Sequence, residues 1–467
     1  IGIHTITAFY QPLAIDEIAS LFFSQTYTYG ELLLKGGPEV IHPPLYYVLV
    51  KILYSLFQSV VILRGFQVFL FIFMLYLLFR IGTEIALTKP QIYFLLTSWS
   101  LSPYILRITY WLRMYTLAIT LQLIVIYLTL QYLKQSQMKL LLWILIVEFL
   151  AFFTVYGSVL FIASQTVIAF YVYFNQRKYL MFFLSHAVML FSSLMSILII
   201  LMMSSDELTH HLNWVEHPNF GNISRTLLNL GGFGDYTTQG FNTLTQNPIL
   251  YGSLFVVLVV LLIVAFRCMK TQVFHKTLQI KYLLAQTGIL FLTFLAVSAF
   301  SAVYPTSLFH ERQLFSFAVS LHIGIPIIIF IVNQRYPTIG AISMAALTIL
   351  YTMQLIPLIP PKIIYPDNII RLDINSAPNP KYGIYPDLVL SYHQCKAVSF
   401  NDIVSKCKTQ GITMVKDLSE VASYIGKEQP FSLLISDAYR GIFGEKYLAR
   451  FCKPHPSVST LWNCIAA

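Results

Sequence analysis

The sequence predicts an all-α polytopic membrane protein with a small extramembrane α/β domain at its C-terminal end. Of its 467 residues, 57% are hydrophobic and only 11% are charged, and the mean hydropathy is +0.69. Such a composition is typical of chains that cross a membrane many times. Apolar runs recur up to residue 358, and the composition becomes mixed and polar after that point. We therefore expect a transmembrane domain over residues 1–358 and a second domain over residues 359–467.

Ten apolar runs are long enough to cross about 30 Å of hydrocarbon, which takes roughly 17 to 25 helical residues. They lie near residues 60–82, 88–106, 113–133, 140–156, 158–176, 180–203, 249–267, 281–303, 314–333 and 337–358. A further helix before Asp16 would bring the number of spans to eleven.

Basic residues predict the orientation of these spans. They fall at alternate connections, at Arg80, Lys89, Lys134, Lys139, Arg177, Lys178, Arg267, Lys270, Lys276, Lys281 and Arg335. Because cytoplasmic loops are enriched in Lys and Arg, these connections are expected in the cytoplasm. The connections 106–112, 204–248 and 304–313 and the C-terminal domain are then extracytoplasmic. The same rule explains most of the net charge of +10, so nucleic acid is not an expected partner.

The run from Pro43 to Gln58 is too short for a comfortable span, and a crossing there would invert every later connection. We interpret it as an amphipathic helix at the outer membrane surface that begins at Pro43 and Pro44. Residues of the first outer segment, about 10–58, then face the extracytoplasmic side.

The C-terminal domain begins near a group of prolines and contains short strand-like runs. The prolines are Pro357, Pro360 and Pro361, and the runs include 388–390 and 431–435. Its four cysteines, Cys395, Cys407, Cys452 and Cys464, allow three pairings, and sequence alone does not choose among them. One or two disulfides are expected if the domain is extracytoplasmic, and free buried thiols are the alternative.

The adjacent acids Asp16 and Glu17 are the first candidate site. In a chain with so few charges, an acidic pair at or near the bilayer marks a functional site, because it is expensive to keep there. The alternative is that both acids begin a helix and face water, since acids suit a first helical turn.

Three further outer groups contain residue types that bind phosphate or metal. Arg107 and Arg113 lie in an outer connection, against the positive-inside trend, and their guanidinium groups suit a phosphate; contact with lipid headgroups is the alternative. His310 and Arg312 precede a span, where a helix N-terminus favours phosphate, and pairing of Arg312 with Glu311 is the alternative. In the loop 204–248, Asp206 with His210 and Glu207 with His211 have metal-ligand spacing, but we favour a solvated loop. The sequence contains no Gly-rich phosphate loop and no Cys-x-x-Cys motif.

These motifs together resemble the polytopic GT-C glycosyltransferases. The matching features are Asp16-Glu17, His42-Pro-Pro-Leu-Tyr46-Tyr47, Arg64, Ser102-Pro103, Arg113-Met-Tyr115, Thr154-x-Tyr156-Gly157 and Arg312. The similar branch contains protein O-mannosyltransferases and bacterial aminoarabinose-type transferases, the family 39-like set. The resemblance extends over about residues 10–335.

The resemblance implies transfer of a sugar from a polyprenyl-phosphate donor to a lipid, glycan or protein acceptor on the extracytoplasmic side. The membrane would be a bacterial inner membrane, or the endoplasmic reticulum in a eukaryote. Asp16 would be the general base, or would orient the acceptor through a divalent metal ion held with His42, and Glu17 would support it. The donor phosphate would be bound by Arg107, Arg113, His310 and Arg312, and the substrate pocket would include His42, Tyr46, Tyr115 and Tyr156. One base and a stabilised phosphate leaving group would give inversion at the anomeric carbon.

Two departures from the family pattern support a different reading of the same fold. Many relatives have Gln-Glu-Ala-Arg where this chain has Trp111 at the glutamate position, and Thr-His-Tyr where it has Thr154-Val155-Tyr156. The first alternative is therefore an inactive GT-C scaffold that serves as a subunit of a membrane complex.

The second alternative is a lipid or solute transporter. The chain has no internal repeat and no matching pair of Gly/Pro-broken helices, and its candidate ionisable residues lie at the outer ends of spans. The transferase hypothesis predicts that Asp16, His42, Arg113 and Arg312 converge on one outer cavity with a groove open to lipid.

Overall fold

The computed structural model describes part of the chain, and its helices form two compact units. The described residues are 2, 4–5, 15–34, 42–203, 218–231, 278–303, 314–355 and five short strands between 381 and 464. The first unit comprises residues 1–11, 65–204 and 212–364, and the second comprises residues 12–64, 205–211 and 365–467. The predicted domain boundary between residues 358 and 359 stays a prediction.

Six of the described helices are long and apolar enough to cross a membrane, which makes this an integral membrane protein. They are α5 (Val60–Glu84), α8 (Tyr115–Gln135), α10 (Ser158–Asn175), α11 (Leu180–Met203) with the short 3₁₀ helix η1 (Arg177–Tyr179) before it, α15 (Leu278–Val303) and α16 (Phe315–Arg335). Each coincides with a predicted span. The predicted span at 249–267 lies outside the described residues.

Two other predicted spans form helices of intermediate length, and a third predicted span is divided into two helices. The first two are α9 (Met138–Thr154) and α17 (Pro337–Leu355). The run 88–106 was expected as one span, but it forms α6 (Lys89–Leu101) and the short α7 (Pro103–Tyr110). Ser102 separates them in an extended conformation, and its side chain accepts a hydrogen bond from the backbone N–H of Ile105. A proline disfavours helical backbone in the residue before it, so Pro103 ends α6 and begins α7.

Helix α16 lies at the centre of the first unit. Its apolar segment is entirely buried, whereas that of α11 is largely exposed. Helices α15, α17, α6 and α8 pack against α16. The close approach of α15 depends on Gly324, because a Cβ there would lie 2.5 Å from Thr287 Oγ1. The exposed side chains of α11 include Phe191, Ile199 and Met202, as expected for a helix that faces lipid.

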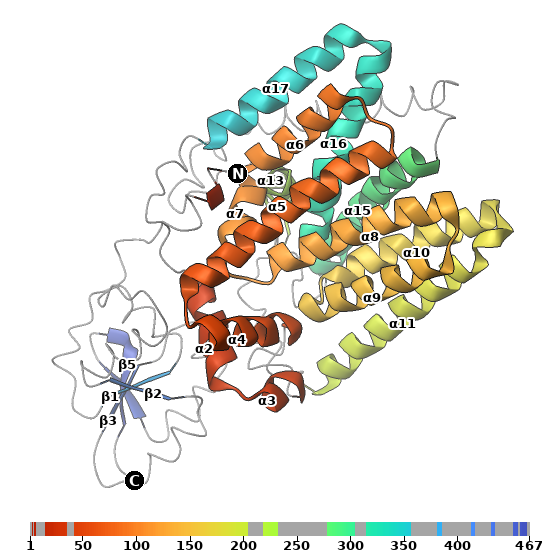
Figure 1. Cartoon of the computed structure of the whole chain (residues 1–467). Coiled ribbons are helices and arrows are strands. Elements are labelled where there is room, and N and C mark those ends of the chain that lie inside the picture. Colours follow the sequence, from red (N-terminus) through yellow and green to blue (C-terminus); the bar gives the residue numbers. More distant parts are fainter. Residues whose placement is uncertain are drawn as a thin grey trace. The chain divides into compact units, whose positions relative to one another are not determined.

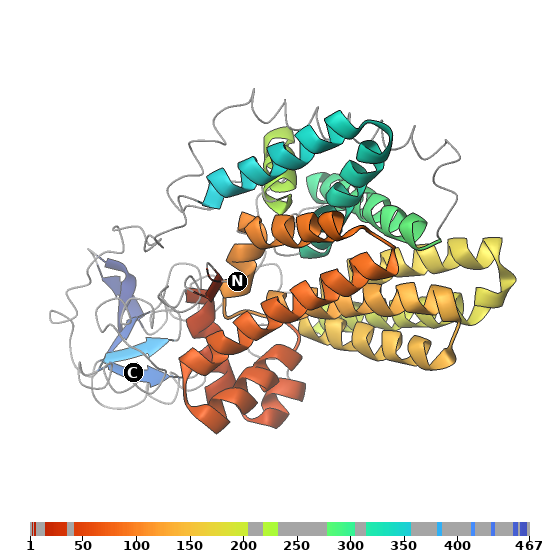
Figure 2. The same ribbon diagram turned by 45° about the horizontal axis from the view of Figure 1, so that its top comes forward.

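Helices α8, α9, α10 and α11 run side by side, as both views show (Figures 1 and 2). Direct packing joins α8 to α9, α10 to α11 and α9 to α11. Helix α10 also packs against α15, so the four helices are continuous with the part of the unit around α16. Helix α13 (Phe220–Leu230), in the long predicted outer loop, packs against α16.

The second unit contains three short helices from the first predicted outer segment. They are α2 (Ile15–Thr26), α3 (Tyr29–Leu34) and α4 (Leu45–Phe57), and both α2 and α3 pack against α4. The predicted helix at 43–58 is therefore confirmed as α4, which follows Pro44 and ends at Gln58 in a left-handed conformation with φ of 49°. Its location at the membrane surface stays a prediction.

The described strands of the C-terminal region form one mixed sheet in the order β2-β1-β3-β5-β4. The strands are β1 (Lys381–Ile384), β2 (Ile412–Val415), β3 (Phe431–Leu434), β4 (Cys452–His455) and β5 (Val458–Cys464). Strand β1 pairs in parallel with β2 and β3, whereas β5 pairs antiparallel with β3 and β4. The strand expected at 431–435 is confirmed as β3, and the one expected at 388–390 lies outside the described residues.

Candidate functional site

The acidic pair lies in the first turn of α2, and Glu17 is buried. Helix α2 begins at Ile15, so both acids are near its N-terminus, where negative charge is favoured. Glu17 is only 1% exposed. The alternative that both acids face water is therefore wrong for Glu17, whose carboxylate is held inside the second unit. The side chain of Asp16 lies outside the described residues.

Arg64 supplies the charge partner of this carboxylate. Its Nη2 atom lies 3.5 Å from Glu17 Oε2, and the two side chains are 5% and 2% exposed. Removing one partner of a buried pair leaves an uncompensated charge and costs about 3–5 kcal/mol. The resemblance included Arg64 without giving it a role, and the structure identifies it as the residue that fixes Glu17.

The motif His42-Pro43-Pro44 leads into α4 with its side chains buried. Proline is tolerated here because the first backbone N–H groups of a helix have no intrahelical partner. The Pro44 carbonyl accepts the hydrogen bond from Val48 N at 3.0 Å, which begins the helical pattern.

Tyr46 and Tyr47 follow in the first turn of α4 and are almost fully buried. The Tyr47 ring meets Phe23 of α2 edge-on, with centroids 6.0 Å apart. The burial of Tyr46 agrees with the predicted role in a substrate pocket, and it agrees equally with a role in the packing of the second unit. Its role in binding therefore stays a prediction.

Lys51 joins α4 to α2 and lies near the ring of Tyr29. Its Nζ donates to the Ser24 carbonyl at 2.9 Å and lies 5.3 Å from the Tyr29 ring centroid. Partial burial lowers the pKa of Lys51, while the nearby Glu31 acts in the opposite direction. These contacts join the C-terminal part of α2 to α4.

Arg113 is buried between α7 and α8 in the first unit. It is 2% exposed, and its backbone carbonyl accepts a hydrogen bond from Gln67 Nε2 at 3.4 Å. Contact with lipid headgroups, the alternative for this arginine, is therefore excluded by its burial. A buried guanidinium fits either a bound anion or an internal partner.

Arg107 stacks on the ring of Trp111. Its guanidinium carbon lies 4.7 Å from the centroid of the Trp111 ring, in a cation–π arrangement. The side chain is partly exposed, and the Trp111 ring holds its position.

Tyr115 and Tyr156, the other predicted pocket residues, occupy different helix ends. Tyr115 begins α8, is buried and lies against Phe315, with ring centroids 6.0 Å apart. Tyr156 lies in the turn between α9 and α10 and packs near Phe152, at a centroid distance of 5.4 Å. Burial raises the pKa of Tyr156 to about 12, so its hydroxyl is neutral and able to donate a hydrogen bond at physiological pH.

The predicted convergence of the site stays a prediction. Asp16 and His42 belong to the second unit and Arg113 to the first. His310 and Arg312 lie outside the described residues, as do Asp206, Glu207, His210 and His211.

The described side chains do not form a metal centre. No group of three or more His, Cys, Asp or Glu side chains is arranged around a common point in the described part of the chain. Glu17 is engaged by a guanidinium, which disfavours a cation at its carboxylate. The metal site expected at Asp16 and His42 stays a prediction.

Sequence reasoning missed a second buried acid. Glu148 in α9 and His186 in α11 are 0% exposed and form a close pair within the helical bundle. The expectation that ionisable residues lie at the outer ends of spans, which disfavoured a transporter, is wrong for this pair. Its signal was present, because one acid and one histidine interrupt the apolar runs 140–156 and 180–203.

Comparisons with known proteins gave two similar crystal structures. Both are of ArnT from Cupriavidus metallidurans, one in the apo state and one bound to undecaprenyl phosphate. The match to the apo structure has a TM-score of 0.42 and 10% sequence identity, and it covers 99% of this chain and 95% of that chain. The match to the structure with undecaprenyl phosphate has a TM-score of 0.40 and 9% sequence identity, and it covers 99% of this chain and 96% of that chain. A likeness of this degree decides neither fold nor activity. No family model matches the chain, and no curated protein matches its sequence.

Proposed function

We propose that this protein is a membrane glycosyltransferase that moves a sugar from a polyprenyl-phosphate donor to an acceptor on the extracytoplasmic side of the membrane. The observation that carries the proposal is the burial of Glu17 against Arg64 in the first turn of α2, beside Asp16. A charged pair is expensive to hold in an apolar environment, and this one fixes the helical turn that bears the expected base.

Asp16 would act as the general base in this reaction. Its carboxylate would take the proton of the acceptor hydroxyl as the hydroxyl oxygen attacks the anomeric carbon. The bond from that carbon to the phosphate oxygen would break on the opposite face, with inversion. Glu17 would be a positioning residue that acts through Arg64 and the backbone of α2.

The leaving phosphate would be stabilised by the arginines of the first unit. Arg113 and Arg107 carry permanent positive charge, and guanidinium groups match phosphate oxygens in pairs. His310 and Arg312 are proposed for the same role, and the donor tail would contact membrane lipid. A divalent ion at Asp16 and His42 would orient the acceptor, but the steps above do not depend on it.

The test compares Asp16→Asn with Glu17→Gln in detergent-solubilised protein, using a panel of polyprenyl-phosphate sugars and lipid, glycan and peptide acceptors. We expect Asp16→Asn to lower the transfer rate by about 10²–10⁴-fold, as the loss of a general base does. Glu17→Gln should lower it less and should also lower thermal stability, because Arg64 loses its charge partner. The matched control is Glu31→Gln in α3, whose carboxylate caps Thr28, and it should leave transfer unchanged.

Full activity of Asp16→Asn would move the base to another residue. If the unmodified protein transfers no sugar with any donor and acceptor, the inactive scaffold is favoured instead. The structural observation that agrees with the inactive scaffold is the stacking of Arg107 on Trp111.

Transport of a lipid or solute is the second candidate, and the observation that favours it is the buried pair of Glu148 and His186. Ionisable residues within membrane spans often mark ion or proton paths. Uptake into vesicles that contain the purified protein, lost in Glu148→Gln, would support transport over sugar transfer.

A further inference from the structure

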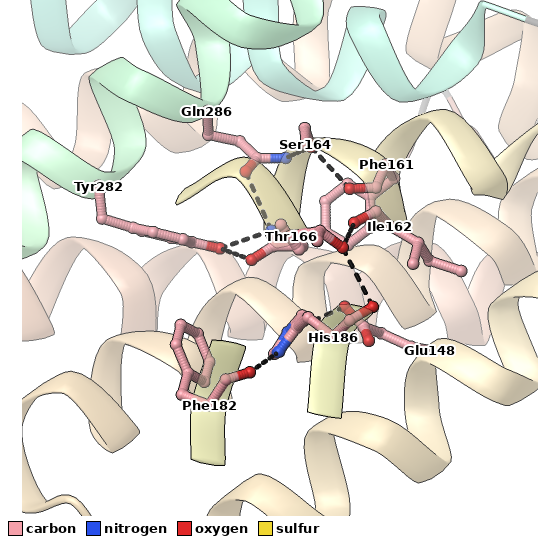
Figure 3. Close-up of polar contacts among 10 residues, drawn as sticks. Glu148, Phe161, Ile162, Ser164, Thr166, Phe182, His186, Tyr282 and Gln286 are labelled. Atoms are coloured by element: carbon pink, nitrogen blue, oxygen red, sulfur yellow. Dashed lines mark hydrogen bonds and ion pairs between the residues drawn. The ribbon is translucent and has the colours of Figure 1, made fainter. Parts of the chain in front are cut away.

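Glu148 and His186 form a fully buried ionisable pair in the described part of the chain, and the proposed transfer reaction does not use it. His186 Nε2 lies 3.3 Å from Glu148 Oε1, and both side chains are 0% exposed. Glu148 belongs to α9 and His186 to α11, so the pair connects two packed helices of the bundle (Figure 3).

The hydrogen on one ring nitrogen of His186 follows from its partner. Nδ1 lies 2.8 Å from the carbonyl oxygen of Phe182. Because a carbonyl oxygen only accepts, Nδ1 carries a hydrogen and donates it. In a neutral imidazole Nε2 would then be a bare acceptor, facing a carboxylate that is also only an acceptor when ionised.

This arrangement requires one more proton. Without it, two lone pairs would face each other at 3.3 Å and a buried negative charge would have no compensation. With it, the pair is either a carboxylic acid beside a neutral imidazole or a carboxylate beside an imidazolium. The net charge is zero in both cases.

No other described group supplies the missing donor. Both oxygens of Glu148 and the Nε2 atom of His186 have no hydrogen-bond partner among the described residues. The neighbouring helices α10 and α15 present Tyr282, Gln165, Gln286, Ser164 and Thr166. Tyr282 is the titratable group of this network. Two more tyrosines lie near Phe182: Tyr132 of α8 packs against the Phe182 ring, and Tyr179 of η1 packs against Tyr132.

The adjacent polar side chains are occupied with one another, as Figure 3 shows. Tyr282 donates to Gln165 Oε1 at 3.0 Å, Gln165 Nε2 donates to Gln286 Oε1 at 3.0 Å, and Gln286 Nε2 donates to Ser164 at 2.7 Å. Thr166 lies 3.1 Å from the carbonyl oxygen of His186. The network thus holds the backbone around the pair without neutralising it.

We propose that Glu148 and His186 form a proton-binding site inside the membrane-spanning bundle, which holds one proton between the carboxylate and the imidazole. The ligand is a proton from water. It is bound when the bundle folds and released when α9 and α11 separate.

The chain contains a matched comparison in His322 of α16. Its Nδ1 also lies 2.8 Å from the carbonyl oxygen four residues earlier, that of Ala318, but its Nε2 is hydrogen-bonded to Ser102 Oγ. A serine hydroxyl can donate to a neutral imidazole, so His322 requires no extra proton. The two histidines differ in what faces Nε2.

The test measures thermal unfolding of the protein in detergent between pH of about 7.5 and 9, where free Glu and His are deprotonated and Tyr is not. If the folded pair holds one proton that the unfolded chain releases, this pair makes the ratio of folded to unfolded protein fall about tenfold for each unit by which the pH rises. Glu148→Gln should remove this component, because its amide donates to Nε2 without a proton from solvent. His322→Asn should keep it.

Should Glu148→Gln fail to fold, the double variant Glu148→Met with His186→Met provides the second measurement, because apolar residues of similar volume often replace buried ionic pairs without loss. It should fold and show no such component. Infrared difference spectra between the unmodified protein and Glu148→Gln should show a protonated carboxyl group or an imidazolium. The proposal would be overturned if the stability of the unmodified protein and that of Glu148→Gln depended equally on pH. Spectra that show a carboxylate beside a neutral imidazole would also overturn it.

Discussion

At the scale of single residues, this protein is defined by a few polar side chains that are buried at considerable cost. Glu17 is held by Arg64, Glu148 lies beside His186, and His4 is hydrogen-bonded within the first unit. In each case the burial is what separates these side chains from ordinary surface charges. Their effects should therefore appear in stability as well as in activity.

His4 gives a prediction on stability against pH. It is 2% exposed, stacks on Phe71 at a centroid distance of 3.7 Å, and has Nε2 2.9 Å from the Ser100 carbonyl oxygen. Burial lowers the pKa of His4 from 6.5 to about 4, and the hydrogen bond to Ser100 acts in the opposite direction. Between these values the unfolded chain takes up a proton that the folded protein does not. The free energy of unfolding should therefore fall as the pH drops from 6.5 to about 4, by about 3 kcal/mol in all.

The measurement is the difference in unfolding midpoint between the unmodified protein and His4→Gln over this pH range. Other titrating groups cancel in this difference. His4→Gln should lose less stability at low pH, whereas parallel curves for the two proteins would show that His4 is not buried in its neutral form.

At the scale of helices and strands, local chemistry decides where elements begin and end, and pairing decides what they bring together. Ser102 and Pro103 divide a run that hydropathy alone reads as one span. In the C-terminal sheet, the antiparallel pairing of β4 with β5 places Cys452 opposite Cys464. The sequence left three cysteine pairings open, and this register favours one of them.

We therefore predict a disulfide between Cys452 and Cys464. Opposite residues of an antiparallel pair have Cα atoms about 4.5–5.5 Å apart, within the span of about 4.4–6.8 Å that a disulfide requires. The bond would form by exchange with a protein disulfide of an extracytoplasmic compartment, which is reduced in the process. Peptide mapping by mass spectrometry without reduction should find the two peptides linked.

The variant Cys395→Ser should leave that link unchanged, and Cys464→Ser should free Cys452 for alkylation. Linkage of Cys452 to Cys395 or Cys407 in the unmodified protein would show that the register does not decide the pairing.

At the scale of the whole molecule, the six long apolar helices found in the described part of the chain make this an integral membrane protein, and the distribution of basic residues predicts its orientation. The proposed transfer reaction needs the first outer segment on the extracytoplasmic side. The proton-binding pair depends only on burial within the first unit. The two proposals can therefore fail separately.

Orientation can be tested by cysteine labelling in a variant whose five native cysteines are replaced by serine. Exposed positions suit single cysteines, namely Ser55 in α4 and Gln137 and Gln176 at the predicted cytoplasmic turns. A thiol reagent that does not cross membranes should label Ser55→Cys in intact cells, and Gln137→Cys and Gln176→Cys only after permeabilisation. The reverse pattern would place the acidic pair in the cytoplasm and contradict extracytoplasmic transfer.

The sequence by itself determined the membrane class, the positions of the long helices and the short helix after His42. These properties follow from hydropathy, from proline chemistry and from the spacing of apolar runs, all of which are local. It also singled out Asp16 and Glu17, as an acidic pair in a chain with few charges, and Arg64, through a resemblance.

Only the tertiary structure decided which polar groups meet. That Arg64 neutralises Glu17 and that Glu148 faces His186 depends on contacts between residues 47 and 38 positions apart in the chain. Hydropathy averages a single acid or histidine into its apolar run, so the run 140–156 reads the same with or without a partner for Glu148. The physical reason is that burial and pairing are properties of packed helices, and no single segment of the chain contains them.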